Sequence, residues 1–129
     1  MTYTISQAAE KMNLSTYTLR YYEREGLLPF LSRTDSGIRA FSEQDLEMLS
    51  IICCLKATGM SIKQIREFIS DWAQGDGTLD KRRKMLSEHR ETIIRQMEDL
   101  KKNLDKIDKK LSCYDAACMG AGVSADVCT

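Results

Sequence analysis

Cysteine thiols are the side chains best suited to covalent chemistry in this chain of 129 residues. Cys53 and Cys54 are adjacent in an apolar stretch, whereas Cys113, Cys118 and Cys128 fall near the end. A thiolate can add to a carbonyl, be alkylated or be nitrosated, and several thiolates together can bind Zn²⁺ or Cu⁺. Five cysteines in a reducing compartment indicate free thiols, metal ligands or sensors rather than structural disulfides.

A second stretch, residues 15–26, reads STYTLRYYEREG and carries groups that bind phosphate. Ser15 is a good N-cap, Gly26 ends the predicted helix, and Leu19 and Tyr22 can face inward. The hydroxyl and guanidinium groups left near the outer side can read phosphates and base edges. They belong to Tyr17, Thr18, Arg20, Tyr21 and Arg24. An ordinary amphipathic surface helix is the alternative for this stretch.

The residues before this helix predict a second helix close to it. Thr4-Ile5-Ser6-Gln7 fits a capping box, and apolar residues at helical spacing predict a helix from about Ile5 to Met12. Asn13 and Leu14 then form a tight connection. Two short helices joined in this way, the second rich in exposed donors, are typical of a helix-turn-helix.

Residues 27–40, LLPFLSRTDSGIRA, predict a hairpin wing after the helix pair. The turn signal is Asp35-Ser36-Gly37, and Arg33 and Arg39 lie on its two arms. We expect both arginines to point where a neighbouring phosphate would lie. A solvent-exposed loop with two unremarkable arginines is the alternative.

Two further helices are predicted, from residue 42 to about 58 and from 62 to about 73, each beginning with a capping box. The first of them has two apolar stripes, which predicts a packing partner on each side. The stripes are Leu46, Leu49, Cys53 and Ala57, and Met48, Ile51, Ile52 and Leu55. Cys54 falls between them at a polar boundary that a reagent can reach. The alternative is that both cysteines are core residues.

The strongest physical signal is a heptad repeat after a hinge at residues 74–78. The predicted seam positions, over a helix from 79 to 112, are Leu79, Leu86, Ile93, Met97, Leu100, Leu104, Ile107 and Leu111. Arg83 and Arg90 occupy the second seam position in the first half. An antiparallel homodimer lays this half over the partner's apolar half, so the arginine heads escape to water. A helix folded back on its own head is the alternative.

Composition limits the function classes. The 19 basic and 19 acidic side chains cancel, which argues against a non-specific DNA-packaging protein. We see no signal peptide and no apolar span of membrane length, so the cytoplasm is the expected compartment. A thiol-dependent enzyme is the alternative class, but the chain lacks a Gly-rich phosphate loop and has one histidine, His89. We expect no enzymatic activity and no cofactor.

The chain resembles the MerR family of bacterial transcription regulators. The resemblance rests on YTISQAAEKMNLSTYTLRYYEREGLL and SRTDSGIRAFSEQDLEMLSIICCLKATGMSIKQIREFI, followed by the long helix. It implies a mainly α fold, with a winged helix-turn-helix head at 1–73 and an antiparallel coiled-coil dimer. It also implies that the dimer deforms promoter DNA and reaches RNA polymerase only indirectly, through that promoter. By this resemblance the DNA-contacting residues are Tyr17, Thr18, Arg20, Tyr21, Tyr22, Arg33 and Arg39.

Within the family, residues 52–60 and the 74–78 hinge are most similar to the AdhR and NmlR branch, which responds to aldehydes, electrophiles or nitrosative stress. The sensing cysteine of that branch aligns with Cys54. Metal sensing through the 113–129 tail is the alternative, with Cys113, Cys118 and Cys128 as thiolate ligands. A redox pair among these tail cysteines is a third possibility. The tail spacing departs from the compact Cys-x₇-Cys loop of the copper sensors. Thr78 stands near the position where divalent-metal sensors often have cysteine.

Overall fold

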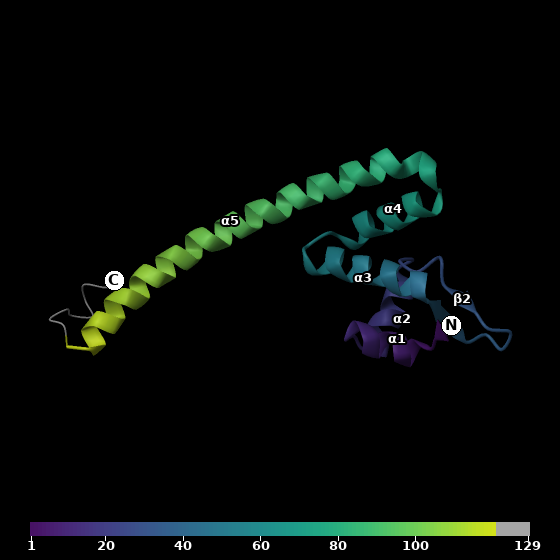
Figure 1. The fold of residues 1–129 in the computed structure, drawn as a ribbon, viewed down its shortest axis with the longest axis horizontal. Helices are drawn as coiled ribbons and strands as arrows, with labels where there is room; N and C mark the ends of the chain where they lie inside the picture. The colour runs from purple at the N-terminus through teal and green to yellow at the C-terminus, as the bar shows by residue number, and fades with distance from the viewer. Residues whose placement is uncertain (121–129) are drawn as a thin grey trace. The chain divides into compact units, whose positions relative to one another are not determined.

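The computed structural model of the chain describes residues 1–120, which are mainly helical as predicted (Figure 1). In order, the elements are β1 (Thr2–Tyr3), α1 (Ile5–Met12), α2 (Thr16–Arg24), β2 (Ser32–Arg33), β3 (Arg39–Ser42), α3 (Glu43–Ala57), α4 (Ile62–Ala73), the 3₁₀ turn η1 (Asp76–Thr78) and α5 (Leu79–Cys118). The chain divides into two compact units, which we name the head unit (Met1–Leu86) and the stem unit (from Ser87 onward).

Side-chain caps define where the first four helices begin. Thr4, Ser15, Ser42 and Ser61 each accept a hydrogen bond from the backbone amide three residues later, at 3.0 to 3.2 Å. Such a cap satisfies an amide that has no partner inside the helix. Three of the four are full capping boxes, which confirms the helix starts predicted near residues 5, 16, 43 and 62.

The connection between α1 and α2 is a left-handed turn at one residue. Asn13 has a φ of 55°, and the amide of Leu14 donates to the carbonyl of Ala9 at 2.9 Å. Asparagine tolerates this conformation better than other non-glycine residues do. The predicted tight connection of the helix-turn-helix is therefore present.

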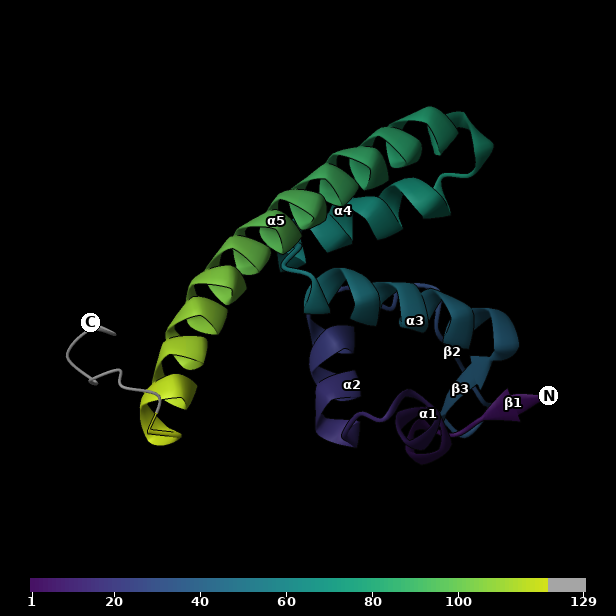
Figure 2. The same ribbon diagram turned by 60° about the vertical axis from the view of Figure 1, so that its left-hand side comes forward.

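The sheet has the order β1-β3-β2, and both strand pairs are antiparallel. Arg33 pairs with Arg39 across the predicted wing hairpin. Strand β1 was not predicted, because two residues carry no recognisable alternation. Figure 2 shows β1 and β3 beside α1 and the start of α3, where the Tyr3 hydroxyl donates to the Glu43 carboxylate.

The core of the head unit is formed by α1, α2, β3, α3, α4 and the loops after α2 and α3. Its largest fully buried side chains are Leu19, Leu27, Phe41, Leu49, Ile52, Ile65 and Ile69. The two-stripe interpretation of α3 needs correction, because Leu46, Leu49, Ile52 and Leu55 are all buried. They form one wide inward face, since both β3 and α4 pack on this helix. Ile51 alone among the large apolar residues of α3 is exposed, at 45%.

Helix α5 runs to Cys118, six residues past the predicted end at 112. The predicted end of the helix at 112 is therefore wrong, because residues 113–118 continue it. Ala116 and Ala117 are strong helix formers, and Gly120, with a φ of 71°, supplies the stop. Cys128 lies outside the described residues. Among residues 1–120, no helix is both long and apolar enough to cross a bilayer.

Candidate nucleic-acid interface and thiol site

The outer face of α2 displays tyrosine and arginine side chains. Tyr17 is 69% exposed, and Arg20 and Arg24 are exposed beside it. The Arg24 guanidinium lies 5.8 Å from the centre of the Tyr17 ring, within cation–π range. These side chains recur every three or four residues, so they share one side of the helix. The face predicted to meet DNA is thus open to solvent.

The remaining predicted contacts on α2 are less exposed. Thr18 is half-buried, and its hydroxyl lies 2.9 Å from that of the cap, Ser15. Tyr21 is also half-buried, with its ring centre 6.1 Å from that of Tyr22. Both keep part of their surface available beside the exposed face.

Tyr22 was expected from the family resemblance to contact DNA, but its side chain is buried. Its side chain is only 6% exposed and belongs to the hydrophobic core. Burial, followed by the neighbouring Cys53 and Tyr21, raises the pKa of its hydroxyl. The inward-facing position predicted for Tyr22 from the helical pattern, beside Leu19, is confirmed.

The wing arginines are bound to a carboxylate of α2. Arg39 donates from Nε to Oε1 of Glu23 at 2.7 Å, and Arg33 donates from one terminal nitrogen to both Glu23 oxygens at 3.2 and 3.3 Å. Arg33 also donates to the carbonyl of Gly37 at 3.0 Å. Sequence reasoning missed Glu23. On the helical wheel it lies only about 60° from Arg20, on the flank of the exposed face.

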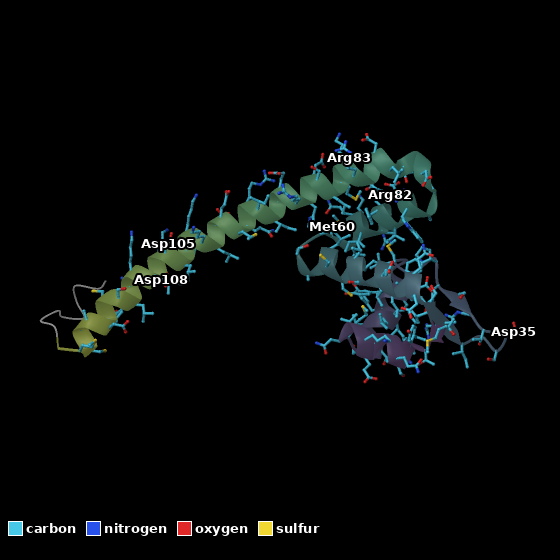
Figure 3. All side chains as sticks on the ribbon, viewed as in Figure 1. Asp35, Met60, Arg82, Arg83, Asp105 and Asp108 are labelled. Atoms are coloured by element: carbon cyan, nitrogen blue, oxygen red, sulfur yellow. The ribbon has the colours of Figure 1, made fainter. Side chains whose placement is uncertain are left out.

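The tip of the wing is a tight turn that carries an acidic residue. The amide of Gly37 donates to the carbonyl of Thr34 at 2.8 Å, and Gly37 adopts a φ of 82°. Figure 3 labels Asp35 at this tip, and its side chain is exposed. The cationic part of the wing is therefore its base, next to α2, and not its tip.

Helix α4 holds the end of α2 through one arginine. Arg66 donates from Nε to the carbonyl of Glu25 at 2.7 Å and forms an ion pair with the Glu25 carboxylate at 3.2 Å. The last carbonyls of a helix lack partners within the helix, so this side chain completes the end of α2.

The joint between α4 and α5 is a polar network within the head unit. Asp71 is 3% exposed, and its Oδ1 accepts from Lys81 at 3.1 Å. Arg82 donates to the Thr78 hydroxyl and the Gly75 carbonyl at 3.0 and 3.1 Å. Figure 3 shows Arg82 on the side of α5 toward α4 and Arg83 on the opposite side. The predicted 74–78 hinge is thus tied to both helices.

The two cysteines of α3 differ in access. Cys54 is exposed, whereas Cys53 is half-buried against the core. Burial, with a smaller contribution from Cys54, raises the pKa of the Cys53 thiol. A thiol with a raised pKa supplies less thiolate at neutral pH. Cys54 therefore has the accessible sulfur that its polar-boundary position predicted.

The described tail cysteines lie in the last turns of α5. Cys113 is half-buried and disulfide-bonded, which corrects the expectation of free thiols at this position, whereas Cys118 is exposed and has a free thiol. Within residues 1–120, no three His, Cys, Asp or Glu side chains lie close enough together to hold a metal ion. The third predicted ligand, Cys128, lies outside this range.

The predicted seam of α5 is largely uncovered in the single chain. Leu79, Leu86, Met97, Leu100, Leu104, Ile107 and Leu111 are 40 to 69% exposed, and Ile93 is half-buried. In the stem unit, Met97, Leu100, Leu104 and Ile107 line one shallow apolar groove. Large apolar side chains in a continuous row indicate an interaction surface.

A capped helix pair with an arginine-bearing hairpin beside its exposed helix defines a winged helix-turn-helix of the DNA-binding class. Comparison with protein families extends this assignment. The chain matches the model for the MerR HTH family regulatory protein over residues 3–72 and the model "MerR, DNA binding" over residues 46–110. The chain belongs to the MerR family of DNA-binding transcriptional regulators.

Similar proteins include regulators from two bacteria. An uncharacterised HTH-type transcriptional regulator of Haemophilus influenzae is 43% identical over 117 residues, 91% of this chain and 87% of that protein. The Bacillus subtilis regulator AdhR is 39% identical over 90 residues, 70% of this chain and 64% of that protein. These relatives agree with the predicted AdhR and NmlR branch, and they are regulators rather than enzymes.

Solved structures of MerR family regulators also match this chain. A crystal structure of HiNmlR, a MerR family regulator lacking the sensor domain, bound to promoter DNA, matches with a TM-score of 0.85 and 42% identity. The match covers 93% of this chain and 96% of that one. A MerR family regulator from Bacillus thuringiensis matches with a TM-score of 0.82 and 40% identity, over 87% of this chain and 98% of that one.

Proposed function

We propose that two copies of this chain pair through α5 as an antiparallel homodimer and bind one promoter in the cytoplasm with their two heads. The observation that carries this proposal is the exposed apolar seam of a 40-residue helix attached to a DNA-binding head. In water such a seam gains free energy when a second helix covers it. The dimer then presents the exposed faces of two α2 helices to a single duplex.

The antiparallel arrangement is supported by charge. Arg83 and Arg90 take the second seam position in the first half of α5, and each is 73% exposed. In a parallel pair each arginine would face its own copy. In an antiparallel pair their aliphatic stems pack on the partner's Met97 to Leu111 half, while the guanidinium groups reach water.

We propose that α2 and the base of the wing contact the phosphate backbone and base edges through Tyr17, Thr18, Arg20, Tyr21, Arg33 and Arg39. Two linked heads bound to one spacer can bend and untwist it, so the energy of DNA deformation becomes the means of regulation. RNA polymerase then responds to the shape of the promoter.

We propose that the signal is a thiol-reactive compound that modifies Cys54. With an aldehyde, the thiolate sulfur bonds to the carbonyl carbon, and the carbonyl oxygen takes a proton from water to give a hemithioacetal. Cys54 lies on α3, which packs against both β3 and α4. An added group at this helix can change how the head engages the partner subunit and hence the DNA.

DNA binding and dimerisation are tested together by sedimentation velocity and by DNase I footprinting of the region upstream of the gene. We expect a dimer at micromolar concentration and protection of a short, nearly palindromic spacer. A monomer, or the absence of any protected site, would contradict the proposal.

The signal is tested by mass spectrometry of the intact protein after exposure to an aldehyde, an S-nitrosothiol or a metal ion, with the modified residue mapped. We expect the first adduct at Cys54. Tight metal retained by Cys113, Cys118 and Cys128, with Cys54 unmodified, would instead support the metal-sensing alternative.

A further inference from the structure

Glu23 is the shared partner of both arginines at the base of the wing. We propose that Glu23 is a positioning residue for sequence-specific DNA binding. It holds Arg33 and Arg39 against α2 and weakens their attraction for phosphates that approach out of alignment. The inference rests on the proposed DNA-binding role of the wing. It assigns an acidic residue a function in recognising a polyanion.

The hydrogen bonds show how the carboxylate positions each arginine. Arg39 donates to Glu23 only through Nε, at 2.7 Å. Within residues 1–120, its two terminal nitrogens have no protein acceptor, so they remain available to an incoming phosphate or base. Arg33 is held from two sides, by Glu23 and by the Gly37 carbonyl. Both guanidinium groups therefore have fixed positions before DNA arrives, which reduces the entropy lost on binding.

Burial makes these contacts more persistent than ordinary surface ion pairs. The side chains of Glu23 and Arg39 are 24% and 25% exposed, whereas Arg33 is 47% exposed. Partly buried pairs are screened less by salt than exposed ones. The contact between α2 and β3 thus has the stability needed to keep the wing in register with the helix that it flanks.

Charge gives Glu23 its second effect. One carboxylate faces two guanidinium groups, so the cluster keeps one net positive charge instead of two. The carboxylate also repels phosphates that approach without the correct alignment. Non-specific affinity depends on the number of phosphates neutralised, whereas specific affinity depends on donors in fixed positions. Removing the carboxylate charge therefore changes the two affinities in opposite directions.

Glu25 supplies a matched control on the same helix end. Its carboxylate pairs with Arg66 of α4 at 3.2 Å, and neither wing arginine contacts it. Glu25→Gln removes the same charge as Glu23→Gln but leaves the wing contacts in place.

The experiment uses the full chain and two DNA probes. The first is a duplex enriched by the wild-type protein from a random library, and the second is a random-sequence duplex of the same length. Fluorescence anisotropy measures Kd for each probe at several salt concentrations, and circular dichroism measures Tm for each variant.

For Glu23→Gln, we expect affinity for the enriched duplex to fall about tenfold, the scale of a lost charge-assisted hydrogen bond. Affinity for the random duplex should rise about twofold, because each head gains one net positive charge. Glu25→Gln should show only the second change.

Two results would overturn the inference while the proposed function stands. The first is that Glu23→Gln behaves as Glu25→Gln does on both probes. The second is that Glu23→Gln weakens binding to both probes together with a large loss of Tm, because Glu23 then serves only to stabilise the head. If the wild-type protein enriches no duplex, the proposed function itself fails and the inference fails with it.

Discussion

At the scale of single residues, the two adjacent cysteines of α3 show how one helical step separates two environments. Cys53 is packed against the hydrophobic core, while Cys54 faces solvent. Successive residues of a helix point about 100° apart, so neighbours in sequence seldom share surroundings. The difference predicts different rates of thiol chemistry.

Iodoacetamide labelling should modify Cys54 before Cys53 at neutral pH. Burial both shields Cys53 and raises its pKa, so at any pH below that pKa its thiolate fraction is smaller than that of an ordinary thiol. Its labelling rate should therefore keep rising as the pH passes 9.0, the ordinary pKa of a cysteine thiol. Peptide mass spectrometry over time and pH measures both rates. Faster labelling of Cys53 at neutral pH would contradict this assignment.

Cys54→Ser should abolish the promoter response to aldehydes or other electrophiles while leaving DNA binding unchanged. The hydroxyl of serine has nearly the size of a thiol but is far less nucleophilic at neutral pH. A reporter assay measures the response, and Cys53→Ala provides the adjacent control, which should retain it. An undiminished response in Cys54→Ser would remove the sensor proposal.

At the scale of elements, the helix caps should contribute measurably to stability. Ser42 ends β3 and caps α3 through a box with Asp45, in which the two hydrogen bonds are 2.8 and 3.0 Å long. Ser42→Ala should lower the free energy of unfolding by about 1 kcal/mol, because the amide of Asp45 loses its acceptor. Urea denaturation measures the change. Ser50→Ala, at an exposed interior position of α3, should change it little.

The joint between α4 and α5 depends on a buried carboxylate. Asp71 is 3% exposed, and within residues 1–120 its Oδ2 has no hydrogen-bond partner. Lys81 reaches its Oδ1 at 3.1 Å and Glu67 at 3.5 Å. The network is therefore sensitive to the loss of its single ammonium group.

Lys81→Met should lower the free energy of unfolding of the head, because a buried acceptor loses its charged donor while the apolar stem is kept. Lys84→Met, one turn further along α5, is the matched control and should have little effect. Thermal and urea unfolding measure both variants. If Lys81→Met unfolded with the same free energy as the wild-type protein, Lys81 would contribute nothing to the joint.

At the scale of the whole molecule, dimerisation is expected to decide whether the two heads act together. Leu104 is a seam residue that is 54% exposed in the single chain, while Lys102 lies on the opposite face of the heptad. Leu104→Glu places a charge where the partner helix should pack. It should give monomers with weak DNA binding, whereas Lys102→Glu should remain dimeric. Sedimentation velocity measures the assembly state, and a dimeric Leu104→Glu would exclude this seam.

The elements could be predicted closely because their signals are local. Caps act over three residues and the heptad repeat acts along one helix, so α1 to α4 and the start of α5 were found where expected. The end of α5 was predicted too early because the heptad repeat stops at Leu111, whereas the helix continues through the cysteines and small residues to Cys118. Strand β1 was missed because its order comes from its partner β3 rather than from its own two residues.

The sequence by itself determined the helix-turn-helix, the wing hairpin, the repeating seam and the family, because each depends on residue types at short, fixed spacings. Only the tertiary structure decided which charges meet. Glu23 pairs with arginines 10 and 16 residues away, and Asp71 pairs with a lysine across a turn. Such partners depend on how the chain returns on itself, since ion pairing is set by distance in space and not along the sequence.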